Sequence, residues 1–222
     1  MMIDSFALYA GAAAVGGGAM AMLSRRQRRR GAVIAASGAM AMVAALAWPA
    51  AERRVTTKSS QLDAIMPSWQ FDEHHTIHVD APPQRVFDAI RNVTADEIAL
   101  FRTLTAIRRA GRAGRESIIN APAGEPILAV ATRSGFRSLA DDPPREMVVG
   151  TRIAPGTLAV MNFLVTPDDH GGSNVSTETR VDAKTPRGRR AFAVYWRMIH
   201  PGSDIIRRMW LRAIKKRAES VL

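Results

Sequence analysis

The pattern of apolar and polar positions divides the chain at about residue 50. Two stretches without a charged residue, Ser5–Leu23 and Gly31–Pro49, are each 19 residues long, and they flank the run Arg25–Arg30, which contains five arginines. As helices rising about 1.5 Å per residue, they would come close to crossing the roughly 30 Å hydrocarbon core of a bilayer. Residues 1–50 are therefore predicted to form two transmembrane helices joined by an arginine-rich turn.

Two alternatives remain open for this region. If translation began at Met20 or Met22, the arginines and the apolar stretch after them would form a secretory signal. A pair of helices buried in a soluble protein is the other alternative. Small residues spaced four apart, such as Gly31, Ala35 and Ala39, would let two helix backbones approach closely.

The rest of the chain predicts one α+β domain. Residues 51–72 are polar and weakly patterned, which is typical of a linker, and residues 73–222 follow as the folded domain. Within it, His74–Asp80 alternates apolar and polar positions as a half-buried strand does. Helices are predicted at Ala81–Ile90 and Ala95–Arg109, whereas Glu125–Ser134 fits a short helix or a strand equally well.

Four strands and a long helix complete the predicted domain. Two hairpins turn at 141–144 and at 168–172, where Gly171 and Gly172 supply positive φ angles, so the sheet is expected to be antiparallel. Thr185 and Pro186 resemble the start of a helix, and Pro201–Gly202 is expected to bend or break it. Its last part carries an apolar stripe on one side and a basic face on the other, formed by Arg208, Arg212, Lys215 and Lys216.

Charge is distributed unevenly, although the chain as a whole has a net charge of +11. Residues 1–60 carry 8 basic and 2 acidic residues (+6), residues 61–183 carry 12 and 16 (−4), and residues 184–222 carry 11 and 2 (+9). The body of the domain is thus mildly acidic, which argues against nucleic acid as a partner. The chain has no cysteine, which excludes disulfides, thiolate metal sites and cysteine nucleophiles.

Two blocks of sequence resemble a known superfamily. IHVDAPPQRVFDAIRNV, from Ile77 to Val93, is similar to an opening strand and helix of the START-related lipid-transfer and polyketide-cyclase (SRPBCC) superfamily. STETRV, from Ser176, and the block from Arg189 to Glu219 resemble a bacterial branch of it. The resemblance implies a helix-grip fold, in which an antiparallel sheet wraps around the C-terminal helix with an apolar cavity between them. It implies no particular catalytic residues.

Candidate chemistry is sparse. His74, His75 and His78 invite a metal hypothesis, but on a strand His74 and His78 would lie about 13 Å apart and His75 would point the other way, so neither metal nor cofactor is expected. Glu178 and Arg180 share a strand face and are predicted to form a cross-strand or exposed ion pair. The alternative is that Glu178 pairs with an arginine of the C-terminal helix, such as Arg190 or Arg197.

The predicted function is a membrane-anchored domain that binds an apolar ligand, such as a lipid or isoprenoid, between the sheet and the C-terminal helix. An enzyme of the cyclase or dehydrase type and a non-catalytic interaction protein are the alternatives. The arginine turn is expected in the cytoplasm and the domain outside it, with the basic face near membrane lipids. The residues predicted to line the cavity, for which plain core packing is the alternative, are Phe87, Phe101, Met161, Phe163, Tyr195, Met198 and Met209.

Overall fold

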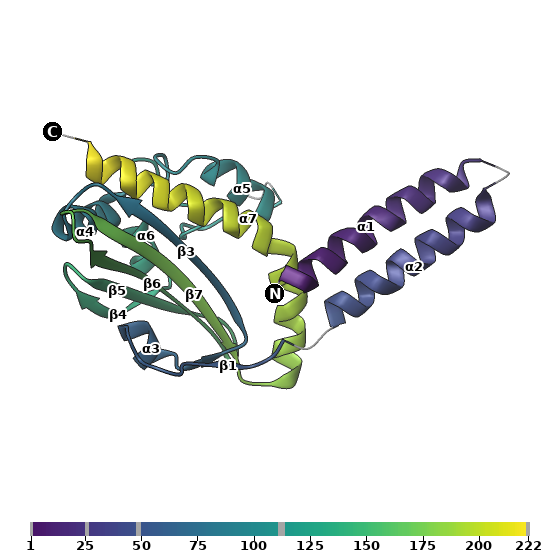
Figure 1. The fold of residues 1–222 in the computed structure, drawn as a ribbon, viewed down its shortest axis with the longest axis horizontal. Coiled ribbons are helices and arrows are strands. Elements are labelled where there is room, and N and C mark those ends of the chain that lie inside the picture. The colour runs from purple at the N-terminus through teal and green to yellow at the C-terminus, as the bar shows by residue number, and fades with distance from the viewer. Residues whose placement is uncertain (1, 25–26, 48–49, 111–113, 221–222) are drawn as a thin grey trace. The chain divides into compact units, whose positions relative to one another are not determined.

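The computed structural model describes residues 2–24, 27–47, 50–110 and 114–220. It consists of two compact units, one formed by residues 1–50 and 189–198 and the other by residues 51–188 and 199–222. Figure 1 shows the order of the helices and strands along the chain.

The first unit contains two antiparallel helices that pack closely through glycine. Helix α1 spans Met2–Met22 and helix α2 spans Arg28–Ala47. A Cβ atom at Gly18 would lie 2.5 Å from the backbone nitrogen of Ala35, and one at Gly31 would lie 2.6 Å from the carbonyl oxygen of Gly18. Because only glycine fits at these distances, the predicted close approach of the two helices through small residues is confirmed.

The prediction of two transmembrane helices is wrong. Among the residues that the structure describes, no helix combines the length and the apolar character needed to cross a membrane. Glycine, alanine and serine, which make up most of α1 and α2, carry little apolar surface, and α2 begins with Arg28, Arg29 and Arg30. Without a span, the predicted membrane location, with a cytoplasmic turn and an external domain, has no basis.

The second unit is built on a five-stranded antiparallel sheet in the order β3-β7-β6-β5-β4. These strands span Phe71–Val79 (β3), Arg137–Asp142 (β4), Glu146–Ala154 (β5), Thr157–Pro167 (β6) and Ser173–Ala183 (β7). The antiparallel hairpins are therefore confirmed. Strand β3 begins three residues earlier than the alternation from His74 indicates, so it also includes Glu73.

Four helices accompany the sheet on its inner side: α4 (Pro83–Asn92), α5 (Phe101–Arg108), α6 (Ile127–Arg133) and the long α7 (Pro186–Glu219). Helix α7 continues through Pro201 and Gly202, so of the predicted bend or break the break does not occur. A proline inside a helix costs about 3 kcal/mol. The buried side chains that follow it, Trp210, Leu211 and Ile214, contribute about 1.5–3 kcal/mol each, which is enough to outweigh that cost.

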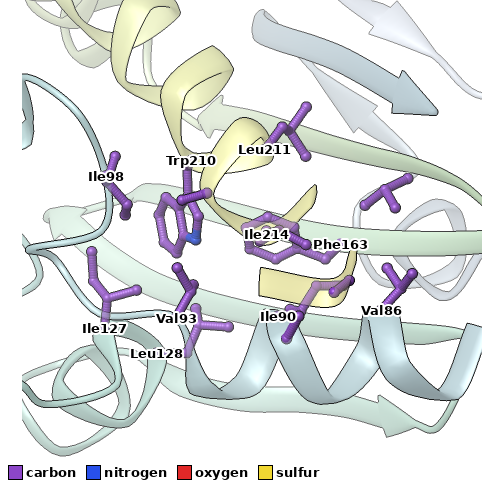
Figure 2. Close-up of a cluster of buried hydrophobic side chains, with 14 of the residues drawn as sticks. Val86, Ile90, Val93, Ile98, Ile127, Leu128, Phe163, Trp210, Leu211 and Ile214 are labelled. Atoms are coloured by element: carbon purple, nitrogen blue, oxygen red, sulfur yellow. The ribbon is translucent and has the colours of Figure 1, made fainter. Parts of the chain in front are cut away.

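The main core lies between the sheet and the C-terminal half of α7 (Figure 2). The rings of Phe163 on β6 and Trp210 on α7 have centroids 5.1 Å apart. Val86 and Ile90 on α4 and Ile127 on α6 are fully buried in the same cluster. A sheet with a long helix packed along one face is the helix-grip arrangement that the sequence resemblance implied.

Residues 51–72 form β1 (Arg53–Arg54), α3 (Gln61–Ile65), β2 (Ser68–Trp69) and the beginning of β3. Leu62, Met66 and Trp69 from this segment form a second buried cluster with Val148 and Val160 on the outer face of the sheet. The fully buried carboxylate of Glu146 accepts hydrogen bonds from the backbone nitrogens of Gln61 (2.6 Å) and Leu62 (3.2 Å). This segment, expected as a linker, thus covers the outer face of the sheet.

Substitution of two neighbouring glycines on α1 should separate the effect of close helix packing from the effect of helix propensity. Gly17→Ala places a methyl group in open space and should stabilise the helix by about 0.5–1 kcal/mol, because alanine has the higher propensity. Gly18→Ala should instead weaken the helix pair, because its methyl group collides with α2. Amide hydrogen exchange of α1 and α2 in the full chain measures both effects. Equal protection in the two variants would contradict close packing at Gly18.

Candidate functional site

Four of the predicted cavity residues belong to the packed core. Phe87, Phe101, Met161 and Phe163 expose 4% of their surface or less and lie in the main cluster, and Met209 is half-buried against it. Their role as ligand contacts stays a prediction.

Tyr195 and Met198, the other two predicted cavity residues, lie on the part of α7 that belongs to the first unit. They expose 37% and 72% of their surface.

A cluster of polar side chains lies at the inner face of the sheet, between β3 and α7. Glu73 and His75 are two residues apart on β3, so both side chains point to the inner face. Nε2 of His75 lies 2.9 Å from Oε1 of Glu73 and 3.5 Å from Oδ1 of Asp204 on α7. The hydroxyl of Ser203 donates a hydrogen bond of 2.7 Å to Oε2 of Glu73. We call these four residues the inner polar cluster.

Arg207 adds a cation beside the inner polar cluster. Its Nη2 donates a 2.9 Å hydrogen bond to Oγ1 of Thr179, its Nη1 contacts the sulfur of Met161, and its guanidinium lies 5.3 Å from the ring centroid of Trp210. Among the described residues, no carboxylate lies within ion-pair distance of Arg207. Burial lowers the pKa of Arg207, and the charge of Glu73 acts in the opposite direction.

Asp204 links the inner polar cluster to the surface. Its carboxylate accepts from Nε of Arg208 at 2.9 Å through Oδ2 and from Nη2 at 3.2 Å through Oδ1. The hydrogen bond from Arg208 is the main reason why the pKa of Asp204 is lowered, with smaller contributions from the charges of Arg208, His75 and His200.

A second ionic cluster lies on the outer face of the sheet. Arg180 is buried and pairs at 2.7 Å with both Glu178 and Asp63, and its guanidinium lies 3.9 Å from the ring centroid of Trp69. The Glu178–Arg180 pair is one of the two alternatives that the sequence left open. The Arg180–Asp63 pair joins β7 to the segment that covers this face. A pairing of Glu178 with Arg197 stays a prediction.

Two of the four residues on the basic face of α7 pair with acidic groups of the same unit. Arg208 pairs with Asp204, and Lys215 pairs with Glu219 at 2.7 Å. Arg212 contacts the sulfur of Met209, whereas Lys216 points outward with part of its surface exposed. The charge density that a membrane surface would meet is therefore smaller than the sequence indicates.

Reasoning from sequence missed the residues of the inner polar cluster other than His75. Glu73 was overlooked because the strand was predicted to begin one residue later, although its i, i+2 spacing to His75 was a usable signal. Ser203, Asp204 and Arg207 lie on a helix, and their meeting with β3 depends on the packing of α7. No local pattern reports such a contact.

Comparison with known proteins found similarity to solved structures. No family model matches the chain, and no curated protein matches it. CalU16 from Micromonospora echinospora is 15% identical over 76% of this chain and 92% of its own, with a TM-score of 0.31. A protein from Mesorhizobium loti is 14% identical over 68% and 100%, with a TM-score of 0.36. A conserved protein from Geobacillus kaustophilus is 13% identical over 67% and 95%, with a TM-score of 0.37. At these scores the fold assignment rests on the chain's own sheet order and core.

The outer cluster should make stability depend on pH in acid. Burial of Asp63 acts to raise its pKa, but hydrogen bonds from Ser59, Arg180 and Ser60 outweigh this and lower the pKa to about 2, from an ordinary value of 3.8. Because the folded state has the lower pKa, this stabilisation is complete above pH 3.8 and is lost as the pH falls toward 2. It amounts to at most about 2 kcal/mol.

Asp63→Asn should therefore lower the free energy of unfolding at pH 6 and bring the variant closer to the parent as the pH falls. Urea unfolding of both proteins between pH 6 and pH 2.5 measures this difference. Asp72→Asn, which removes a more exposed partner of Arg53, is the matched control and should have a smaller effect. A constant difference between Asp63→Asn and the parent across this range would contradict the ion-pair role of Asp63.

Proposed function

We propose that this chain binds a small molecule with an apolar body and an acidic group at the inner face of the sheet, against α7. Arg207 contacts the acidic group. A lipid-like or isoprenoid-like acid has this chemistry.

The position of Arg207 is the observation that carries this proposal. A guanidinium has five N–H donors, and those of Arg207 meet one hydroxyl and one thioether instead of a carboxylate. A buried charge is expensive unless it is paired. Arg180, on the opposite face of the same sheet, has two carboxylate partners. A carboxylate on the ligand would pair with the guanidinium of Arg207, as Glu178 and Asp63 pair with that of Arg180.

Partly exposed apolar side chains on β3 and α7 support the second part of the proposal. Ile77 on β3 and Ile206 and Met209 on α7 are packed against the core but retain part of their exposed surface. Arg207 itself is half-buried. Methionine adapts readily to guests of varied shape. An alkyl chain lying along these side chains would bring its acidic end to Arg207.

Binding of dodecanoate and dodecanol to the full chain tests this function, because the two probes differ only in the polar end. We expect dodecanoate to bind more tightly. Hydrogen bonds to a charged group contribute about 1.5–3 kcal/mol, so Arg207→Met should weaken dodecanoate binding by about 10–100-fold. Dodecanol affinity should stay nearly unchanged. Isothermal titration calorimetry measures all four affinities.

Arg208→Met is the matched control, since Arg208 is the neighbouring residue and exposes 59% of its side chain. It should bind dodecanoate like the parent chain. If the parent binds neither probe, the proposed function is wrong. If Arg207→Met and Arg208→Met weaken dodecanoate binding equally, the acid is attracted by general surface charge and Arg207 does not recognise it.

A further inference from the structure

The inner polar cluster has the donor atoms of a metal site. Glu73, His75 and Asp204 each offer one ligand atom, and these three atoms all lie within 4.8 Å of one another. The Glu73 and His75 side chains expose 2% and 8% of their surface, and the Asp204 side chain exposes 30%. We infer that Glu73, His75 and Asp204 bind a divalent transition-metal ion, for which Zn²⁺ is the reference case.

The distances between the donor atoms suit a metal ion. Zinc bonds to imidazole nitrogen and carboxylate oxygen are about 2.0–2.2 Å long, so two ligands of a tetrahedral ion lie about 3.4 Å apart. Nε2 of His75 lies 2.9 Å from Glu73, somewhat shorter than this value, and 3.5 Å from Asp204, slightly longer than it. A modest approach of the two carboxylates would complete the three-ligand set.

Hydrogen bonds hold both carboxylates with one oxygen turned toward His75. Ser203 occupies Oε2 of Glu73, so that Oε1 faces the imidazole. Arg208 makes its shorter hydrogen bond to Oδ2 of Asp204, and Oδ1 faces the same nitrogen. Supporting hydrogen bonds of this kind orient metal ligands in proteins. The cluster is therefore organised around one point, where three donor atoms converge.

His75 alone cannot satisfy both carboxylates. Nε2 carries at most one proton, which can be donated fully to Glu73 or to Asp204 but not to both. A cation at the point of convergence would interact with all three donor atoms. Imidazole together with carboxylates suits zinc, iron and manganese, and three protein ligands leave a coordination position for water or a substrate oxygen.

The neighbouring arginines do not occupy this point. Arg207 binds Thr179 and Met161 and does not pair with Glu73. Nη2 of Arg208 also donates a hydrogen bond of 3.2 Å to Oδ1 of Asp204, and because the Arg208 side chain is largely exposed, this longer bond can give way to a cation while the bond to Oδ2 remains. Metal binding does not depend on the proposed ligand, because none of the three metal ligands is a residue that we assign to that ligand.

Titration of the untagged full chain with Zn²⁺ tests the inference. We expect one ion per chain, and replacement by Co²⁺ should give the visible absorption of a nitrogen- and oxygen-ligated site. Ser203→Ala should weaken binding by about 10–100-fold, as loss of a supporting hydrogen bond does. Glu73→Gln, His75→Gln and Asp204→Asn should each weaken it at least as much. Circular dichroism of each variant verifies its fold, and Asp204→Asn, at a part-exposed position, keeps the test decisive if a β3 variant does not fold.

The chain offers a matched control in His78. Its Nε2 lies 2.6 Å from Asp168 and its Nδ1 lies 3.5 Å from Asp80, so the two carboxylates lie on different ring nitrogens and do not converge. His78→Gln and Asp168→Asn should leave the affinity for Zn²⁺ unchanged. The inference is wrong if the parent chain does not bind one Zn²⁺, if His75→Gln or Asp204→Asn binds as the parent does, or if His78→Gln abolishes binding.

Discussion

The domain depends on one constraint, which is that both faces of its antiparallel sheet must be covered. Side chains alternate between the two faces, and the central strands β5 and β6 present apolar residues to both sides. Helix α7 and the core around Trp210 cover the inner face, and residues 51–70 cover the outer face through Leu62, Met66 and Trp69. Because the covering elements are far apart in sequence, the polar groups that meet between them are also distant in sequence. The inner polar cluster and the ionic cluster around Arg180 on the outer face both arise in this way.

Arg180 and Arg207 lie on opposite faces of the sheet, and their charges are compensated differently. Arg180 has carboxylate partners on its own strand and on α3, and Trp69 covers its guanidinium. Removal of one partner of such a pair would destabilise the folded state, because the remaining charge would stay buried without compensation. Arg207 has a hydroxyl and a thioether, which compensate a positive charge poorly. An uncharged side chain at position 207 would avoid this cost, and the acidic ligand that we propose would compensate the charge.

The sequence predicted the parts of this fold that local pattern controls. Alternation identified the strands, and Gly171–Gly172 marked the turn between β6 and β7, where Gly171 has a φ of 85°. The role of residues 51–72 was not predictable, because α3 has only five residues and its apolar groups act through contacts with β5 and β6. The transmembrane prediction failed for a different reason. Absence of charge over 19 residues favours a span, whereas glycine-rich helices lack charge without being strongly apolar.

Helix periodicity explains why the candidate site is rigid although its residues come from distant segments. Ser203, Arg207, Trp210 and Ile214 are three or four residues apart on α7, so they lie along one side of the helix. Trp210 and Ile214 are fixed in the core, and a helix turns as one body. The packing of the core therefore sets the position of α7 along its axis and its rotation about that axis. These determine where Ser203 meets Glu73 and where Arg207 meets Thr179. A change in the core near Trp210 would move the polar groups without touching them, whereas a change in the cluster would leave the core in place.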